Sequence, residues 1–292
     1  MNSQIETPNI LLRCEKLNSE IGFLEIITIF VSMRIILLSL SLVLLISGLP
    51  ISVFCQPKTI LAIFAHPDDE NIIGHVLAKY ARSGHKVQVL IATDGKEGTR
   101  VTSIPAGDSL GAIRRQESIC ACEALGILPP VFLHLDRLDT KIGVRKYLNC
   151  RKQLLDEVKK HIELLQPDVL ITFGPDGEYG HSEHIVTSAV VQEVLLREGW
   201  VEKYPLFFPA FTKSEVNNDD DISFVDEKYL NLKVKYSDDD EMKMFKAAKC
   251  YLTQFTESEI QELITDETTD KLNIMYFRQF IVTTGNRTDF WE

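Results

Sequence analysis

The sequence lacks the marks of several common protein classes. Its six cysteines among 292 residues include no CxxC pair and have no regular spacing, which argues against a disulfide scaffold and against a cysteine-bound zinc cluster. Internal repeats, low-complexity linkers and a basic stripe are also missing. With 31 Lys and Arg against 42 Asp and Glu, the formal net charge is −11, and such an acidic chain repels phosphate backbones. We therefore expect no nucleic-acid partner.

A hydrophobic segment lies near the N-terminus. Residues 35–46 contain only apolar side chains and two serines, and they are preceded by Met33 and a single arginine. This layout is typical of a secretory signal peptide that starts at Met33, whereas the uncharged residues 35–55 are long enough to span a bilayer as an uncleaved anchor. We therefore predict an exported (periplasmic or secreted) or membrane-anchored protein. We expect residues 1–55 to be an N-terminal extension plus signal peptide or anchor, with Met33 as the true start and residues 1–32 as an upstream over-extension of the reading frame.

Strand and helix patterns alternate after this segment. Short apolar runs predict buried parallel strands, at residues 59–65, 87–93, 131–135 and 168–173. Apolar residues at helical spacing predict helices, at residues 72–82, 108–126, 144–165 and 182–198. Such alternation favours an α/β fold with a Rossmann-like, doubly wound, mostly parallel sheet in three α/β/α layers. We expect a single domain over residues 56–292.

The pattern weakens beyond residue 200. Residues 206–211 are typical of a strand and residues 241–255 of a helix. The acidic segments 215–227 and 237–241 are predicted to be solvated surface segments, because neither has the spaced ligands and turn glycine of an EF-hand loop.

The cysteines leave their pairing open. Cys120 and Cys122 are two positions apart on a predicted helix, so they point to different faces and are not expected to bond to each other. In an exported protein either one can pair with Cys150 or Cys250.

Two clusters of ionisable residues follow predicted strands. The sequence HPDDE at 66–70 ends the first strand, and YGHSEH at 179–184 follows the fourth. Ligands of open α/β sheets bind beyond the carboxyl ends of the strands, and imidazole and carboxylate are ligands of divalent metals in catalytic sites. Taken singly, the first cluster could cap a helix and the second could be an ordinary helix surface. Together they favour a metal site.

These residues resemble the signature of a known family. AHPDDE at 65–70, with Gly180, His181 and His184, is similar to the motifs of the PIG-L/LmbE-like de-N-acetylases. The resemblance extends over residues 58–198. It includes the TDG that follows the second strand and the R-x-x-E-x-x-x-A-x-x-x-L-G pattern that starts at Arg114. It implies a hydrolase that uses metal-activated water to remove an N-acetyl group from an N-acetylglucosamine-type sugar or glycoconjugate.

The resemblance also implies roles for individual residues. His66, Asp69 and His184 match the ligands of Zn²⁺, with another divalent metal such as Fe²⁺ as the alternative. Asp68 matches the general base that takes a proton from metal-bound water. His181 matches the residue that, as imidazolium, stabilises the oxyanion.

Further residues of the pattern are expected at the substrate or behind the ligands. Arg114 matches a substrate-contacting arginine, and its alternative is an ion pair with Glu117 or another helix neighbour. Tyr179 stands where some members have a tyrosine near the reacting carbonyl. Family members often have Pro-Asp between the two downstream histidines, whereas this chain has Ser-Glu, and Glu183 can still orient the neighbouring imidazole.

Two other functions remain open at this point. A metal-dependent amidase acting on a non-sugar amide shares the same ligands. A non-catalytic Rossmann-like ligand-binding module is the rival from another class, although HPDDE stands where a dinucleotide-binding module has GxGxxG. The expected partner is a small-molecule amino sugar or glycoconjugate, with membrane association through the N-terminal segment as a further alternative.

Overall fold

The computed structural model describes residue 28 and residues 31–39, 56–216, 222–269 and 272–291. The chain divides into two units, Met1–Gln56 and Pro57–Glu292. In the first unit, residues 31–39 are helical and their side chains are exposed. The described residues include no helix that is both long enough and apolar enough to cross a bilayer. Most of the predicted signal peptide or anchor, residues 40–55, lies outside the described residues.

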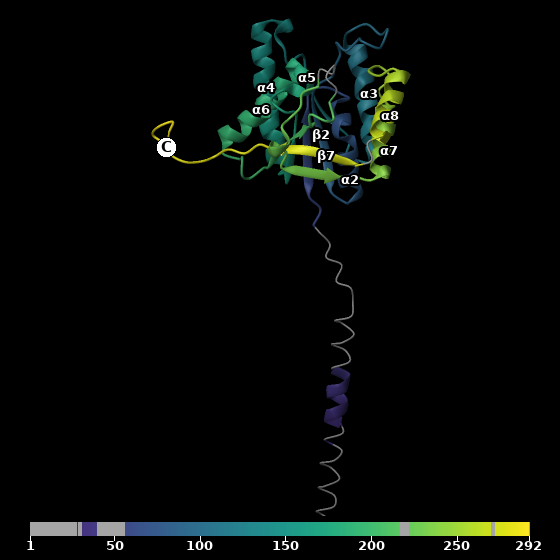
Figure 1. Ribbon diagram of the computed structural model, residues 1–292, viewed down its shortest axis with the longest axis vertical. Coiled ribbons are helices and arrows are strands. Elements are labelled where there is room, and N and C mark those ends of the chain that lie inside the picture. The colour runs from purple at the N-terminus through teal and green to yellow at the C-terminus, as the bar shows by residue number, and fades with distance from the viewer. Residues whose placement is uncertain (1–27, 29–30, 40–55, 217–221, 270–271, 292) are drawn as a thin grey trace, which may run out of the picture. The chain divides into compact units, whose positions relative to one another are not determined.

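A seven-stranded sheet organises the described part of the second unit (Figure 1), in the order β3-β2-β1-β4-β5-β7-β6. Its parallel strands are β1 (Thr59–Phe64), β2 (Lys86–Thr93), β3 (Val131–Leu135), β4 (Val169–Ile171) and β5 (Leu206–Ala210). Two antiparallel strands, β7 (Ile274–Gln279) and β6 (Leu232–Lys235), extend the sheet beyond β5. The strand order reverses between β1 and β4, which is the position where open α/β sheets bind ligands. The predicted doubly wound, mostly parallel sheet is confirmed.

Helices cover both faces of this sheet (Figure 1). One layer holds α2 (Gly74–Arg82), α3 (Asp108–Leu125) and α7 (Asp238–Ala248), with α8 (Glu257–Thr269) beside α7. The opposite layer holds α4 (Val144–Leu165) and α6 (Ser182–Glu198). The three layers predicted from the alternating pattern are therefore present.

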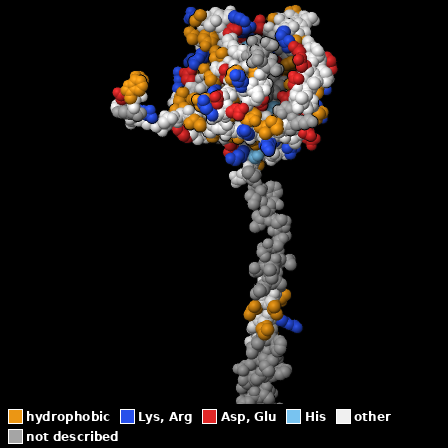
Figure 2. Space-filling model, in the orientation of Figure 1, with side chains coloured by type: hydrophobic (Ala, Val, Ile, Leu, Met, Phe, Trp, Pro, Cys, Tyr) orange, Lys and Arg blue, Asp and Glu red, His pale blue; other side chains and the backbone are white. Residues whose placement is uncertain are grey.

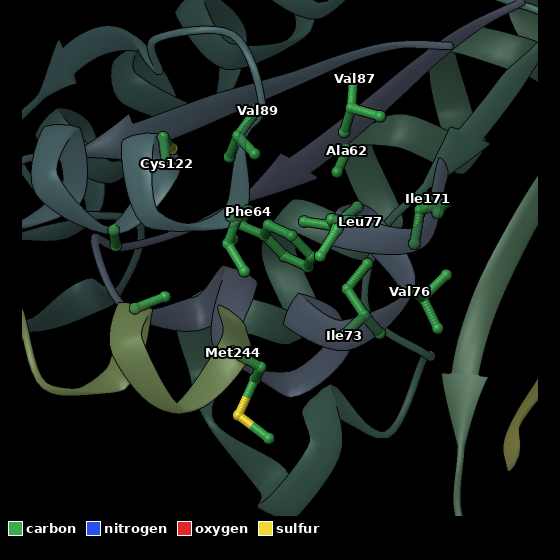
Figure 3. Close-up of a cluster of buried hydrophobic side chains, with 14 of the residues drawn as sticks. Ala62, Phe64, Ile73, Val76, Leu77, Val87, Val89, Cys122, Ile171 and Met244 are labelled. Carbon is green, nitrogen blue, oxygen red and sulfur yellow. The ribbon is translucent and has the colours of Figure 1, made fainter. Parts of the chain in front are cut away.

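The apolar run of β1 serves both cores at once. Because successive strand side chains point to opposite faces, Ile60, Ala62 and Phe64 enter the core under α2, α3 and α7. Figure 3 shows part of that core. Leu61 and Ile63 enter the core under α4 and α6. A fully buried Leu, Ile or Phe contributes about 1.5–3 kcal/mol, so β1 is fixed from both sides.

The outer surface carries both signs of charge. On the face shown in Figure 2, Lys and Arg side chains are interspersed with Asp and Glu. Pairs such as Lys159–Glu198, at 2.5 Å, join α4 to α6. Exposed pairs of this kind contribute about 1 kcal/mol or less, so the buried faces of these helices hold the layer in place.

Helix α7 corrects two expectations for the last third of the chain. It starts at Asp238 and ends at Ala248, whereas the sequence pattern predicts a helix over 241–255. The acidic segment 237–241 is no loop but the start of this helix. Ser237 and Asp240 form a capping box, and acidic side chains in a first helical turn are favoured by the helix dipole. Strands β6 and β7 and helix α8 are absent from the sequence-based prediction.

A disulfide joins α3 to the segment after α7. Cys120 and Cys250 are bonded, while Cys122 and Cys150 are buried free thiols. This is one of the pairings that the sequence leaves open. The disulfide therefore fixes the segment that follows α7 against α3.

We predict that Cys120→Ser lowers the free energy of unfolding by about 2–4 kcal/mol, because the bridge closes a long loop in the unfolded chain. The two cysteines are 130 positions apart. Urea unfolding of both proteins measures the difference. A reductant should destabilise the wild type and leave Cys120→Ser unchanged; equal sensitivity of the two proteins would contradict the prediction.

Asp240 offers a second test of the fold. Its buried carboxylate accepts hydrogen bonds from Arg82 Nε and Nη2, both at 2.8 Å, and from the Ser237 N–H at 2.9 Å. We predict that Asp240→Asn lowers the free energy of unfolding by about 2–3 kcal/mol, because Asn lacks the charge that pairs with Arg82 and keeps only one of the two acceptor oxygens that Arg82 and Ser237 share.

The same substitution has a predicted pH dependence. The hydrogen bonds from Arg82 hold the pKa of Asp240 well below its usual range. The stabilisation is therefore complete above the unfolded-state pKa of about 3.9 and is lost as pH falls towards the lower folded-state pKa. The difference between wild type and Asp240→Asn should be constant from about pH 5 to 8 and shrink below about pH 4. A difference that grows in acid would be inconsistent with this account.

Candidate active site

The two polar clusters meet at the switch point of the sheet. HPDDE follows β1, and YGHSEH follows β4 through the short helix α5 (Gly177–Gly180). The ring centroid of His66 lies 5.0 Å from that of His181 and 5.4 Å from that of His184. Side chains from two distant parts of the sequence thus form one site at the carboxyl ends of adjacent parallel strands.

Three histidines of this site form a group that could hold a metal ion. One ring nitrogen each of His66, His181 and His184 lies within 4.8 Å of the other two. The carboxylate of Asp69 lies between two of these rings, with Oδ1 3.2 Å from His184 Nε2 and Oδ2 3.6 Å from His66 Nδ1. The structure therefore brings the three predicted ligands, His66, Asp69 and His184, together and adds His181 to them.

The surroundings of these side chains fit a cation. The Nδ1 atoms of His181 and His184 are buried and have no hydrogen-bond partner among the described residues. Burial alone would lower the pKa of His66, yet Asp69 and Glu183 raise it to about 10, so the local field favours positive charge at this point. Imidazole nitrogen and carboxylate oxygen are ligands of zinc and of other divalent first-row metals. The residues present therefore suit a divalent metal.

Hydrogen bonds fix two of the predicted ligands. His66 Nε2 lies 2.7 Å from Glu183 Oε2, and the other oxygen of Glu183 accepts the N–H of Leu138 at 2.5 Å. Asp69 Oδ2 accepts the N–H groups of Ala65, at 3.0 Å, and of His66, at 2.7 Å. The imidazole that Glu183 orients is therefore His66, in the other cluster, and not one of its neighbours in sequence. Carboxylates that orient metal-binding imidazoles in this way strengthen metal binding.

Asp68 is held by Arg114 in an uncommon backbone conformation. Its φ is 99°, a region that costs a residue other than glycine about 1–3 kcal/mol. Arg114 Nη2 donates to Asp68 Oδ1 at 3.0 Å and to the carbonyl of Pro67 at 2.6 Å, while Nη1 donates to the carbonyl of Gly95 at 2.6 Å. The side chain of Asp68 caps no helix N–H. Burial raises the pKa of Asp68 to about 6, against the effect of Arg114.

The two predicted substrate contacts occupy different places. Arg114 is buried beneath the site, and its ion pair is with Asp68 rather than with Glu117. Glu117 instead accepts hydrogen bonds from the backbone and side chain of Thr253, at 2.9 and 2.6 Å. Tyr179 is 47% exposed, and its ring centroid lies 5.7 Å from that of His181. Of the two, Tyr179 is the one that a ligand in the site can reach directly.

The surroundings of His181 oppose the charged form that the resemblance implies. Burial and the neighbouring histidines lower its pKa to about 4, so the ring is neutral near pH 7. The resemblance implies an imidazolium at this position. A neutral imidazole still has one N–H to donate to an oxyanion.

The structure adds residues that the sequence analysis does not single out. Glu178 Oε2 lies 3.6 Å from His184 Nδ1. Glu70, the last residue of HPDDE, is buried and accepts a hydrogen bond from the hydroxyl of Tyr251. Glu178 directly precedes YGH, so its position in the motif was a usable signal. Tyr251 lies 181 positions from Glu70, and no local pattern indicates that contact.

Fold and site together define a class of protein. It is an α/β domain with a cluster of histidines and carboxylates, suited to binding a metal ion, at the switch point of its sheet. Residues 61–195 match the family described as PIG-L: GlcNAc-PI de-N-acetylase. This stretch of the chain therefore matches the PIG-L family, as the sequence motifs predict.

Individual relatives are similar over part or most of their length. The 1D-myo-inositol 2-acetamido-2-deoxy-alpha-D-glucopyranoside deacetylase of Rhodococcus erythropolis is 37% identical over 150 residues, which cover 46% of this chain and 51% of the relative. The enzyme of the same name from Actinosynnema mirum is 31% identical over 176 residues, covering 54% and 62%. The N,N'-diacetylchitobiose deacetylase structure from Pyrococcus horikoshii superposes with a TM-score of 0.56 at 21% identity, covering 77% of this chain and 84% of that one.

These matches also set limits and bring a correction. The chain spans about half to three fifths of the length of the two curated relatives. Their names give a glycoside of inositol as the compound acted on. The expectation that this protein is exported or anchored in a membrane through residues 35–55 is contradicted by these relatives and is wrong.

We predict that the purified full chain binds one zinc ion and that His66→Ala and His184→Ala each weaken binding at least about 100-fold, because each removes a donor from the group. Competition with a chromophoric chelator measures the affinity. His134→Ala is the matched control, because that side chain is 59% exposed and pairs with Asp94, outside the group. Loss of affinity in the control alone would rule out the assigned site.

Proposed function

We propose that this protein is a metal-dependent hydrolase that removes the acetyl group from an N-acetylglucosamine-type sugar or a small conjugate of one. The observation that carries the proposal is the convergence of Asp68, the His66–Asp69–His184 group and His181 at one strand edge of a PIG-L family domain. Zinc is the proposed metal, held by His66, Asp69 and His184. When bound, it would polarise the acetyl carbonyl and favour deprotonation of water.

Asp68 is the proposed general base. It takes a proton from the water that attacks the acetyl carbonyl carbon and later delivers a proton to the amine nitrogen as the C–N bond breaks. The products are acetate and the free amine. The contact with Arg114 at 3.0 Å fixes one carboxylate oxygen, which leaves the other available for proton transfer. Arg114 then acts by positioning Asp68.

His181 and Tyr179 are proposed to face the reacting carbonyl. The N–H of a neutral His181 donates to the oxygen that gains charge as water adds, and removal of such a donor typically costs about 100-fold or more in rate. Tyr179, at the exposed rim of the site, is in a position to contact the sugar beside the acetyl group.

The substrate class is an N-acetylated amino sugar joined to a small polar group. The names of the relatives support this, because they specify an inositol glycoside and a chitobiose derivative, both of which carry an acetamido sugar. HPDDE and YGHSEH, the second of which includes Tyr179, both lie within the matched residues 61–195.

We predict that Asp68→Asn lowers kcat by about 100- to 10,000-fold while zinc affinity stays within about twofold of the wild type, because the base is lost and the ligands are kept. Acetate release with added zinc is measured on N,N'-diacetylchitobiose, on the N-acetylglucosaminyl inositol glycoside and on N-acetylglutamate. Asp136→Asn is the matched control, since Asp136 pairs with Lys96, outside the ligand group.

Three outcomes separate the possible functions. Release from a sugar substrate by the wild type and the control, but not by Asp68→Asn, supports the proposal. Release from N-acetylglutamate alone means that the protein is an amidase of another class. Equal release by wild type and Asp68→Asn contradicts the proposed mechanism.

A further inference from the structure

The imidazole of His184 has close contacts on one ring face and at Nε2, but no hydrogen bond at Nδ1. Its ring stacks on Phe173 with centroids 3.8 Å apart and an interplanar angle of 4°, and its Nε2 lies 3.2 Å from Asp69 Oδ1. The other ring nitrogen, Nδ1, is buried without a hydrogen-bond partner. Glu178 Oε2 lies 3.6 Å from it. The only acidic oxygen that the structure describes beside this nitrogen therefore comes from Glu178.

The backbone of Glu178 is in a conformation that side chains rarely adopt. Its φ is 69° and its ψ is −69°, the values of the rare and strained γ-turn with positive φ. The loop holds it there, because Asp176 Oδ2 accepts the N–H of Glu178 at 3.1 Å and the carbonyl of Glu178 accepts the N–H of Ser223 at 2.7 Å. Such strained residues cluster at functional sites. Glycine would fit this position with less strain, yet the chain has a glutamate.

The other imidazole of the group shows what such a carboxylate does. His66 directs Nδ1 towards Asp69 and has Glu183 at 2.7 Å from Nε2. A carboxylate behind a metal-binding imidazole fixes the tautomer and orientation of the ring and increases its basicity. His184 has the same arrangement with the nitrogens exchanged: Nε2 faces Asp69 and Nδ1 faces Glu178.

We propose that Glu178 is a positioning residue, whose carboxylate accepts the Nδ1–H of His184 and so presents Nε2 to the metal. The inference rests on the metal centre of the proposed function. The separation of 3.6 Å is longer than a hydrogen bond, and the Glu178 side chain, 22% exposed, closes it by rotation about its own bonds. Each of the two imidazole ligands then has a carboxylate of its own, from α6 for His66 and from α5 for His184.

The test uses Glu178→Gly, because this change has two opposite expected effects. Loss of the backbone strain stabilises the protein, whereas loss of the carboxylate behind His184 weakens zinc binding. In the metal-stripped full chain, Glu178→Gly should unfold at the same temperature as the wild type or higher, since glycine relieves the strain. Its zinc affinity, from chelator competition, should fall by about 10- to 100-fold. Glu178→Gln, whose amide oxygen accepts the same hydrogen bond, should lose less affinity than Glu178→Gly. Zinc affinity of Glu178→Gly within twofold of the wild type would overturn the proposal.

Two further variants make the result specific. Asn273→Gly is the matched glycine control, because Asn273 also has a positive φ, 46°, and lies outside the site; its zinc affinity should equal that of the wild type. His184→Ala separates the two levels of the argument. If His184→Ala loses affinity and Glu178→Gly does not, the role of Glu178 is wrong and the metal centre stands. If His184→Ala binds zinc as tightly as the wild type, the metal centre itself is wrong.

Discussion

The parallel pairing of β1 with β4 is the constraint on which the site depends. Ile60, Leu61 and Ala62 lie opposite Val169, Leu170 and Ile171, so the two strands end side by side and their following segments start from one edge. The hydroxyl of Thr172 donates to the carbonyl of Ile63 at 2.7 Å, just beyond the last paired residues. Because both strands are buried between two helical layers, neither can shift without opening a core. The positions of His66 and His184 follow from this pairing.

Buried carboxylates then connect the site to the rest of the domain. Glu70 binds the hydroxyl of Tyr251, and Glu117 binds the backbone and side chain of Thr253. Burial raises the pKa of Glu70 to about 8. A buried carboxyl group is costly unless it is hydrogen-bonded, so each contact fixes the segment after α7 against HPDDE or α3. The Cys120–Cys250 bridge holds the same segment covalently. The segment after α7 thus holds HPDDE and α3 in place.

The sequence predicts the parts of the structure that depend on local patterns. The apolar runs and helical spacing define β1 to β5 and α2, α3, α4 and α6 to within a few residues, and HPDDE and YGHSEH are correctly expected at strand ends. Helix α7 is misplaced because its acidic first turn resembles a loop in composition, although Ser237 and Asp240 are a capping signal. The antiparallel strands β6 and β7 are missed because β6 has only four residues and both lie outside the strand–helix alternation that predicts the parallel strands.

Within the site, residue types were predictable but partners were not. The sequence places Glu183 between two histidines and cannot show that it contacts His66, 117 positions away. It pairs Arg114 with substrate or Glu117, whereas the fold places Asp68 against it. Both contacts are set by the packing of α3 and α6 on the sheet, which no spacing along the chain encodes. The position of Glu178 directly before YGH was a usable signal, but its approach to His184 depends on an uncommon backbone conformation that the sequence does not show.

The most direct test of the account is anomalous X-ray diffraction at the zinc edge from crystals of the full chain grown with zinc. The account predicts one strong anomalous peak at the switch point, about 2.0–2.2 Å from one atom each of His66, Asp69 and His184. A peak at other residues, or no peak at the switch point with zinc in excess, would contradict it.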